Sequence, residues 1–251
     1  MSKEPIIRVK DLVCGYGGNR IIDGISFDVQ PGEIFVILGG SGCGKSTLLK
    51  HMIGLFEPME GQITIDGTDL VGADIATRQK LFRKFGVMYQ LGALFGSMSL
   101  RENVRIPLEE YTSLPSDAMD VIAKMKLSLV GLGDFLDHPP SAISGGMQKR
   151  AAIARAMALD PRILFLDEPS AGLDPVTSAE LDELIINLSR NLGITFVVVT
   201  HELPSIYTIA DRVIMLDKRV KKIVAEGKPQ TLRDESKDPW VRQFFNRAAH
   251  A

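Results

Sequence analysis

The chain has 251 residues, of which 45% are hydrophobic and 24% are charged, an apolar content that supplies a sizeable core. Its 29 basic and 31 acidic residues give a formal net charge of −2, so no overall electrostatic field attracts nucleic acid and we expect no nucleic acid partner. The sequence starts without an apolar signal segment, and no stretch approaches the roughly 18 apolar residues of a membrane span. If a membrane matters to its function, we expect another subunit to cross it.

The first third of the chain is predicted to be rich in β-structure. Glycine-rich sequence at 15–19 and a Pro-Gly turn at 31–32 punctuate it. The last predicted strand of this part ends in an Asp-Gly turn. The strand-like patterns cover residues 6–13, 24–29, 33–38 and 61–67.

A glycine-rich loop with the pattern G-x-x-x-x-G-K-S follows the strand predicted at 33–38. Its glycines allow backbone N–H groups to close around the β- and γ-phosphates of a nucleotide, Lys45 reaches the same oxygens, and Ser46 is placed to ligate Mg²⁺. A helix with an apolar face begins after Gly44, so the positive end of its dipole points at the anion. The alternative, a glycine-rich turn with a solvated lysine, is disfavoured by the flanking strand and helix. The predicted nucleotide-binding residues are Gly39, Gly40, Ser41, Gly42, Cys43, Gly44, Lys45, Ser46 and Thr47.

The middle of the chain is predicted to be helical, from about residue 91 to 159. Ser116 is a candidate N-cap for a helix over 117–130, and Ser144 for a helix that runs to 158. The remaining third alternates, and its uniformly apolar strands suit a parallel sheet covered on both faces. Strands are expected at 163–166, 195–199, 212–216 and 223–226, and helices at 175–191, 204–209 and 238–245.

These patterns predict an α/β fold of the P-loop NTPase class, with a β-rich N-terminal part and an inserted α-helical subdomain. We expect one domain over 1–251, because no low-complexity linker divides it. The core, with its antiparallel β part, is assigned to about 1–90 and 160–235, the helical subdomain to about 91–159, and a C-terminal helix and tail to 236–251.

Two acidic residues follow the apolar strand predicted at 163–166. Asp167 and Glu168 therefore come at the carboxyl end of a buried strand, where α/β sheets bind their ligands. We expect Asp167 to hold Mg²⁺ from its outer coordination sphere and Glu168 to polarise the attacking water as a general base. The alternative is an acidic strand end that faces solvent.

A second glycine motif, Ser144-Gly145-Gly146, starts a helix rich in small residues. The cap serine and the two glycines expose the first amides of that helix, which makes a second anion site far from the first in sequence. An ordinary glycine-softened helix start is the alternative, but it does not explain why the motif falls just ahead of the acidic strand.

Taken together, these motifs resemble those of the ATP-binding subunits of ABC transporters over nearly the whole chain. The phosphate loop, the signature motif that starts at Ser144, and Asp167-Glu168 occur in the family's order, and residues 170–174 resemble its D-loop. The resemblance implies a single ABC ATP-binding domain with a RecA-like core and a head-to-tail homodimer. Two ATP molecules would be sandwiched in it, each between one subunit's phosphate loop and the other's signature helix, with Asp174 also at the nucleotide.

The same resemblance assigns roles to three further residues. Tyr16 matches the aromatic residue that stacks on adenine, although an ordinary turn tyrosine is the alternative. Gln90 resembles the Q-loop glutamine that senses Mg²⁺ and the membrane subunit, and His201 resembles the switch histidine that contacts the γ-phosphate. The expected catalytic residues are thus Glu168, His201, Lys45 and Gln90, and the expected metal-binding residues are Ser46, Gln90 and Asp167.

Details outside these motifs are similar to lipid-transport ATPases of the Mla/Mce (Mkl-like) group. The similar stretches are 90–98, 102–104 and 241–244, together with Met147. Importers for betaine and related solutes also have methionine at the position of Met147. Gly40 replaces a common proline, and Gln148 stands where the group often has a basic residue. The similarity implies a transmembrane permease, an MCE-domain lipid-binding partner, and peripheral attachment at the cytoplasmic face of the inner membrane.

Two other functions stay open at this point. The first is the ATPase of a betaine-like or amino-acid importer, and the second is a soluble ABC clamp in translation or DNA repair. One phosphate loop in 251 residues disfavours the second, because such clamps usually carry two nucleotide domains or a long coiled-coil insertion. The C-terminal helix, with Trp240, Phe244 and Phe245, either docks a small regulatory subunit or packs within the chain.

Overall fold

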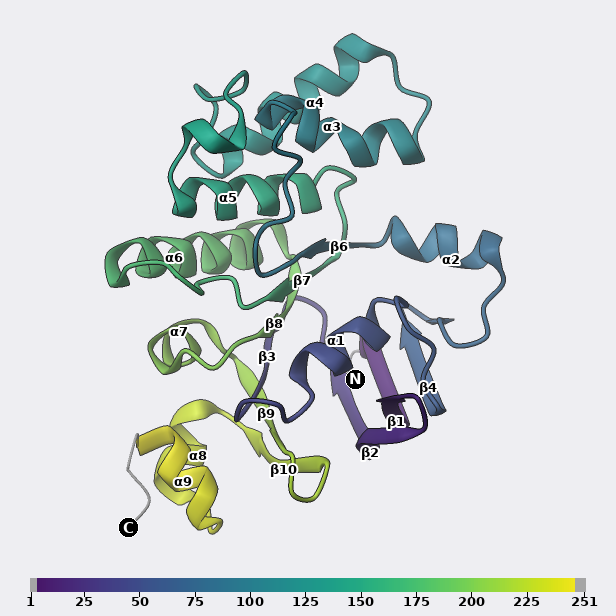
Figure 1. The fold of residues 1–251 in the computed structure, drawn as a ribbon, viewed down its shortest axis with the longest axis vertical. Coiled ribbons are helices and arrows are strands. Elements are labelled where there is room, and N and C mark those ends of the chain that lie inside the picture. Colours follow the sequence, from purple (N-terminus) through teal and green to yellow (C-terminus); the bar gives the residue numbers. More distant parts are fainter. Residues whose placement is uncertain (1–3, 247–251) are drawn as a thin grey trace.

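Two β-sheets organise residues 4–246, the part of the chain that the computed structural model describes (Figure 1). The smaller sheet is antiparallel, in the order β2 (Asn19–Val29), β1 (Ile7–Tyr16), β4 (Glu60–Ile65) and β5 (Thr68–Asp69). The larger sheet has the order β10 (Lys222–Gly227), β9 (Arg212–Asp217), β3 (Ile34–Gly39), β8 (Thr195–Val199), β7 (Ile163–Asp167) and β6 (Phe85–Met88). Its strands are parallel except β10, which pairs antiparallel with β9 at one edge.

The hairpin between β1 and β2 is tighter than the sequence predicted. The glycine-rich stretch 15–19 was expected to separate the strands, but pairing continues until Tyr16 lies opposite Asn19. Gly17 and Gly18 have φ angles of 55° and 83°. Two successive residues with positive φ make a turn whose twist matches that of the flanking strands, so the expectation of a longer break was wrong.

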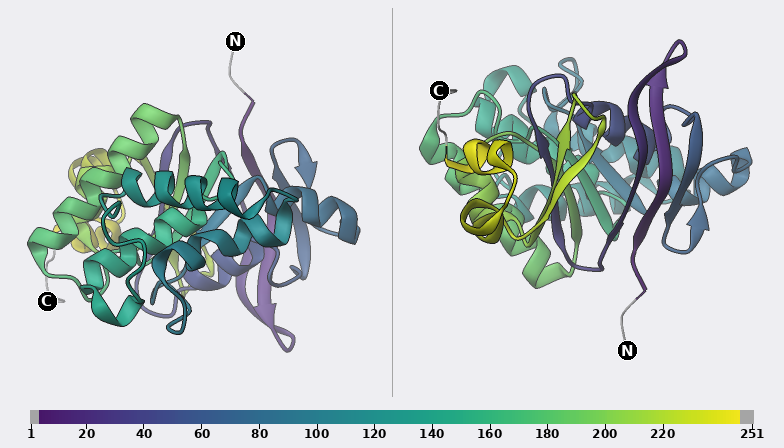
Figure 2. Two further views of the ribbon diagram at one scale, coloured as in Figure 1. Left: turned by 90° about the horizontal axis from the view of Figure 1, so that it is seen from above. Right: turned by 90° about the horizontal axis from the view of Figure 1, so that it is seen from below.

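Strand β3 separates two hydrophobic cores. On one face, Phe35 and Ile37 pack with the antiparallel sheet and with α1 (Lys45–Met52). On the other face, Ile34, Val36 and Leu38 join the core that contains the helices. Figure 2 shows the antiparallel sheet on one side of the central sheet. On the other side lie the helices α5 (Gly145–Ala156), α6 (Pro175–Leu192) and α7 (Leu203–Ile209). This burial on both faces explains why β3 reads as a continuous apolar run.

Most helices lie where the sequence predicted them. Between β6 and β7 come α3 (Leu100–Tyr111), α4 (Ser116–Leu129), a short 3-10 turn at Pro140–Ala142 and α5 (Gly145–Ala156), at one end of the molecule (Figure 1). The last third contains α6 (Pro175–Leu192), α7 (Leu203–Ile209) and α9 (Pro239–Asn246). Two short helices, α2 (Ile75–Phe82) and α8 (Pro229–Glu235), were not predicted.

Two predicted helix boundaries were wrong. Helical structure does not start at residue 91 but at Leu100, because Ser99 and Glu102 form a reciprocal capping box there. Ser116 is the first residue of α4 and not its N-cap, a position that Pro115 occupies without a side-chain cap. The cap expected at Ser144 is confirmed, since its hydroxyl accepts a hydrogen bond from the amide of Met147.

Among residues 4–246, no helix combines the length and apolar character needed to cross a bilayer.

Candidate functional site

The loop after β3 is shaped by residues without side chains. A Cβ on Gly39 would lie 2.4 Å from the carbonyl oxygen of Leu216 on β9, so no larger residue fits at the end of the strand. Gly44 precedes α1 with φ 102°, and no side chain caps the first amides of that helix. These amides therefore stay available to an anion held by the loop.

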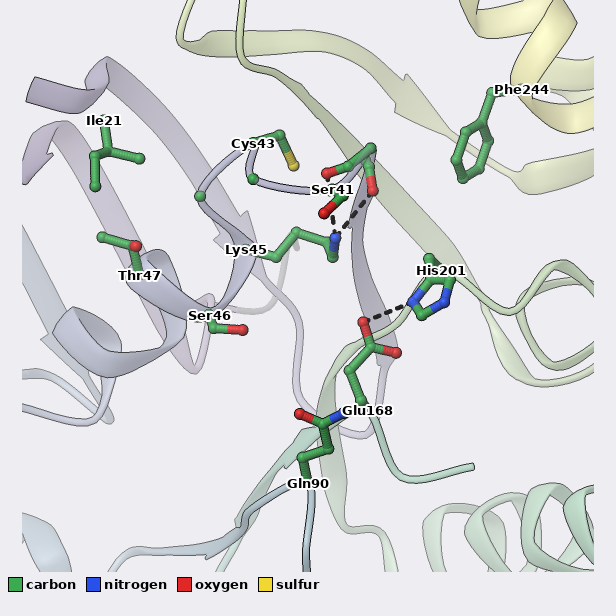
Figure 3. Close-up of a pocket in the computed structure, with 14 residues that line it drawn as sticks. Ile21, Ser41, Cys43, Lys45, Ser46, Thr47, Gln90, Glu168, His201 and Phe244 are labelled. Atoms are coloured by element: carbon green, nitrogen blue, oxygen red, sulfur yellow. Dashed lines mark hydrogen bonds and ion pairs between the residues drawn. The ribbon is translucent and has the colours of Figure 1, made fainter. Parts of the chain in front are cut away.

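A cavity of about 660 Å³ opens over this loop. Figure 3 shows side chains from four distant parts of the chain facing it, which are Lys45, Gln90, Glu168 and His201. Its wall also includes Ile21 of β2 and Phe244 of α9. The predicted nucleotide-binding residues 39–47 all line this cavity.

Lys45 extends from the first turn of α1 into the loop. Its Nζ donates hydrogen bonds to the carbonyl oxygens of Gly39 at 3.0 Å and Gly40 at 3.4 Å (Figure 3). These contacts hold the ammonium group within the curve of the loop. A cation at this point is suited to neutralise phosphate oxygens that the loop amides bind.

Ser46 and Asp167 meet beside Lys45. The Ser46 hydroxyl donates to Oδ1 of Asp167 across 3.3 Å. Burial raises the pKa of Asp167 above its ordinary value, the Ser46 hydrogen bond opposes that shift, and the charge of Glu168 adds to it. A hydroxyl and a carboxylate are hard oxygen ligands that fit Mg²⁺, which takes few protein ligands when phosphates supply the others. The described residues hold no cluster of three or more His, Cys, Asp or Glu that could bind a metal by itself.

Glu168 is held in an unusual conformation after β7. Its φ is 47°, a region that side chains rarely adopt, and its amide donates to the carbonyl of Val199 at 2.8 Å. Oε1 accepts a hydrogen bond from Nδ1 of His201 at 2.8 Å (Figure 3). Oε2 is buried without a hydrogen-bond partner within residues 4–246. Glu168 itself lines the cavity, and a carboxylate beside a phosphate site is suited to accept a proton from water.

The segment around Gln90 is fixed by two cations of α5 that the sequence did not reveal as part of the site. Lys149, which is 7% exposed, donates to the carbonyl oxygen of Gln90. Arg155 donates to the carbonyl oxygens of Gly92 at 2.8 Å and Ala93 at 2.7 Å. Burial lowers the pKa of Lys149, while the charges of Asp167 and Glu168 oppose that shift. The backbone of the Gln90 segment is thus tied to the helix that begins at the second glycine motif.

Comparison with known proteins decides the family. A model of the ABC transporter family matches residues 22–171, more than half of the chain. The chain belongs to the ABC transporter family. It is therefore an ATP-binding subunit that hydrolyses ATP, and its α/β P-loop fold class is confirmed.

The relatives within this family cover most of the chain. The chain is 43% identical over 96% of its length to the probable ribonucleotide transport ATP-binding protein mkl of Mycobacterium leprae (strain TN), of which it covers 68%. It is 40% identical over 96% of its length to the intermembrane phospholipid transport system ATP-binding protein MlaF of Escherichia coli (strain K12), of which it covers 88%. A solved dimeric ATP-binding cassette in a post-hydrolysis state, bound to ADP and Pi, is similar with a TM-score of 0.79 and 30% identity, over 88% of this chain and 98% of that one.

The signature and D-loop residues of this ABC subunit do not line its own cavity. Ser144 caps α5, and Gly146 lies so close to α6 that an added Cβ would be 2.3 Å from Cγ2 of Thr177. Asp174 caps α6 by accepting from the amides of Val176 and Thr177, and it also accepts from the Thr177 hydroxyl at 2.5 Å. Within one chain, these residues join the start of α5 to the start of α6.

The Tyr16 ring likewise lies outside the lining of the cavity. It ends β1 and meets the ring of Phe56 edge-on, with 5.3 Å between the centroids. His51, which is buried in α1, lies 6.2 Å from the Tyr16 ring. Tyr16 is 40% exposed, so a stacking partner can still reach it.

Proposed function

We propose that this chain is the motor subunit of a transporter that moves phospholipid or another lipid across the bacterial envelope. It would act at the cytoplasmic face of the inner membrane, attached through a transmembrane permease. The observation that carries the cargo assignment is 40% identity, across 96% of the chain, to a protein named as part of an intermembrane phospholipid transport system. An MCE-domain lipid-binding protein and a small regulatory subunit complete the proposed assembly.

We further propose that two copies of the chain bind ATP between them, head to tail. Ser144, Gly145 and Asp174 are exposed and lie outside the cavity of their own chain, which leaves them free to face the phosphate loop of the other. The similar cassette bound to ADP and Pi is dimeric, which supports this arrangement. Each copy would then contribute the signature amides that its partner's site lacks.

The proposed hydrolysis depends on positioning and charge neutralisation. Lys45 and the loop amides bind the β- and γ-phosphates, and Ser46, with Asp167 and Gln90 nearby, holds Mg²⁺. When bound, Mg²⁺ neutralises charge on the phosphates. The free Oε2 of Glu168 orients the attacking water and takes its proton, while His201 fixes the other carboxylate oxygen and reaches the γ-phosphate. Adenine stacks on Tyr16.

The cargo proposal is tested by purifying the membrane complex through a tag on this chain. Mass spectrometry then identifies the co-purifying proteins and lipids, with an unrelated inner-membrane complex as the measure of lipid background. We expect a permease, an MCE-domain protein and phospholipid above background. A solute-binding protein with lipid at background would contradict lipid transport and favour a solute importer, the alternative that the shared Met147 signature keeps open.

A further inference from the structure

The C-terminal helix α9 reaches the phosphate loop. Phe244 lines the cavity on the side where Ser41 and His201 lie (Figure 3). One turn earlier on the same helix, Trp240 lies beside the loop, with Cζ2 4.0 Å from the position that a Cβ on Gly40 would occupy. Two aromatic rings at i and i+4 therefore form one side of the loop, and we name them the α9 wall.

The neighbouring face of α9 anchors the wall to the protein. Val241 is fully buried and Phe245 is 3% exposed, and both belong to the core that contains the helices. The carbonyl of Phe245 accepts a hydrogen bond from the hydroxyl of Tyr207 on α7 at 3.0 Å. At the start of the helix, Asp238 accepts from the amide of Trp240 at 2.8 Å. Because α9 is fixed at both ends, Phe244 at the cavity and Trp240 beside Gly40 are held in place.

An ion pair behind the phosphate loop supports Trp240. Asp217 ends β9, next to the pairing of Leu216 with Gly39, and is only 3% exposed. Nε of Arg219 donates to Oδ2 of Asp217 at 2.7 Å, and the Arg219 guanidinium lies 5.1 Å from the centre of the Trp240 ring. Arg219 thus neutralises a carboxylate that would repel phosphates and holds the indole through a cation–π contact.

We propose that Trp240 and Phe244 are positioning residues for ATP, which hold the phosphate loop in its binding shape and exclude water from one side of the triphosphate. Exclusion of water lowers the local dielectric constant, so the attraction between Lys45 and the phosphates becomes stronger. Arg219 is the side chain that keeps the indole against the loop. This inference rests on the assignment of the cavity to ATP.

The chain offers a direct reporter, because Trp240 is its single tryptophan. ATP and Mg²⁺ are titrated into the full-length Glu168→Gln variant, and tryptophan emission is compared with ATP binding measured by calorimetry. We expect the emission to change and to saturate with the calorimetric Kd. Emission that does not respond while calorimetry shows binding would overturn the proposal.

Kinetics of the otherwise unchanged protein give a second test. Phe244→Ala is expected to raise the KM for ATP about three- to tenfold with a smaller change in kcat, the loss expected for one aromatic contact. Trp240→Phe keeps a ring beside the loop and is expected to leave the KM near that of the wild type. Val220→Ala removes apolar atoms from the exposed turn beside Arg219 and serves as the matched control. An unchanged KM in Phe244→Ala, with an unchanged melting temperature, would also overturn the proposal.

The Lys45→Ala variant separates this proposal from the site assignment. In one outcome, Lys45→Ala loses ATP binding while the Trp240 emission of Glu168→Gln does not change when ATP is added. This result refutes the proposed role of the α9 wall and leaves the assignment of the cavity to ATP in place. If Lys45→Ala binds ATP like the wild type, the assignment of the cavity to ATP is itself wrong. Loss of binding in Lys45→Ala together with a saturating emission change supports both.

Discussion

Nδ1 of His201 lies 2.8 Å from Oε1 of Glu168, and Oε2 has no hydrogen-bond partner within residues 4–246. The two side chains come from the ends of the neighbouring parallel strands β7 and β8, so the sheet itself sets their separation. We propose that this pair divides two tasks between the two carboxylate oxygens, orientation at Oε1 and proton transfer at Oε2.

Replacement of Glu168 by glutamine is expected to lower kcat for ATP hydrolysis by about 10²-fold or more, because the amide cannot accept the proton of water. ATP binding is expected to persist, so the variant should accumulate as an ATP-bound dimer. Steady-state kinetics and size-exclusion chromatography with ATP measure both effects. Wild-type turnover in this variant would refute the role of Glu168.

His201→Ala tests whether the pair acts as a unit. The single variant loses the hydrogen bond to Oε1 of Glu168, and we expect a fall in kcat of about 10²-fold. The double variant with Glu168→Gln is expected to be little worse than Glu168→Gln alone, because residues that act together give non-additive losses. If the fall in kcat of the double variant equals the product of the two single falls, the two residues act independently.

Lys149 is expected to stabilise the Gln90 segment. Lys149→Met removes the charged donor from the carbonyl of Gln90, at a cost of about 1–3 kcal/mol in the free energy of unfolding. Lys149→Arg retains a donor and should lose less. The exposed Lys124 of α4, changed to methionine, is the control, and urea unfolding is the measurement. Equal losses of unfolding free energy in Lys124→Met and Lys149→Met would contradict a stabilising role of the hydrogen bond between Lys149 and Gln90.

Gly146 is expected to be required for packing between α5 and α6. In Gly146→Ala, the new Cβ would lie 2.3 Å from Cγ2 of Thr177, so the helices must shift, at about 1–3 kcal/mol of stability. Thr177→Ser removes Cγ2 and keeps the hydroxyl that donates to Asp174. The double variant should therefore recover the melting temperature, and failure to recover would exclude this steric cause.

Protonation of Asp182 on α6 is expected to make the stability of the folded chain depend on pH. Burial raises its pKa from 3.8 to about 6, and a hydrogen bond with Ser205 partly opposes that shift. The folded chain holds the Asp182 proton more tightly than the unfolded chain. The stability gained from this proton is therefore complete below pH 3.8 and is lost as the pH rises through about 6. The loss amounts to about 3 kcal/mol at neutral pH.

Asp182→Asn removes that dependence. The variant should be more stable than the wild type at pH 8 and closely similar to it at pH 4, as measured by urea unfolding at both values. The exposed Asp134, changed to asparagine, gives the background effect of removing one carboxylate. A gain of the same size at pH 4 and pH 8 would contradict the assignment.

Local patterns predicted much of the fold and of the nucleotide loop. The Ser144 cap depends on neighbouring residues and the strands 163–167 and 195–199 on uninterrupted apolar runs, so they were found within one residue. The errors arose where a few atoms decide a boundary, as in the Gly17-Gly18 turn and the capping box at Ser99. The division into a core and a helical subdomain at 91–159 stays a prediction, as do the roles of the site residues.

The phosphate loop, the order of the ABC motifs and the alternation of strands and helices can be read from the amino acids alone, because each is carried by short-range spacing. Three contacts emerged only from the folded chain: Phe244 borders the same cavity as Lys45, Lys149 holds the carbonyl of Gln90, and Gly146 abuts Thr177. These contacts join segments that are far apart along the chain. They arise because α5 packs on β6 and α9 packs on α8, around a sheet whose strand order is not the order of the sequence.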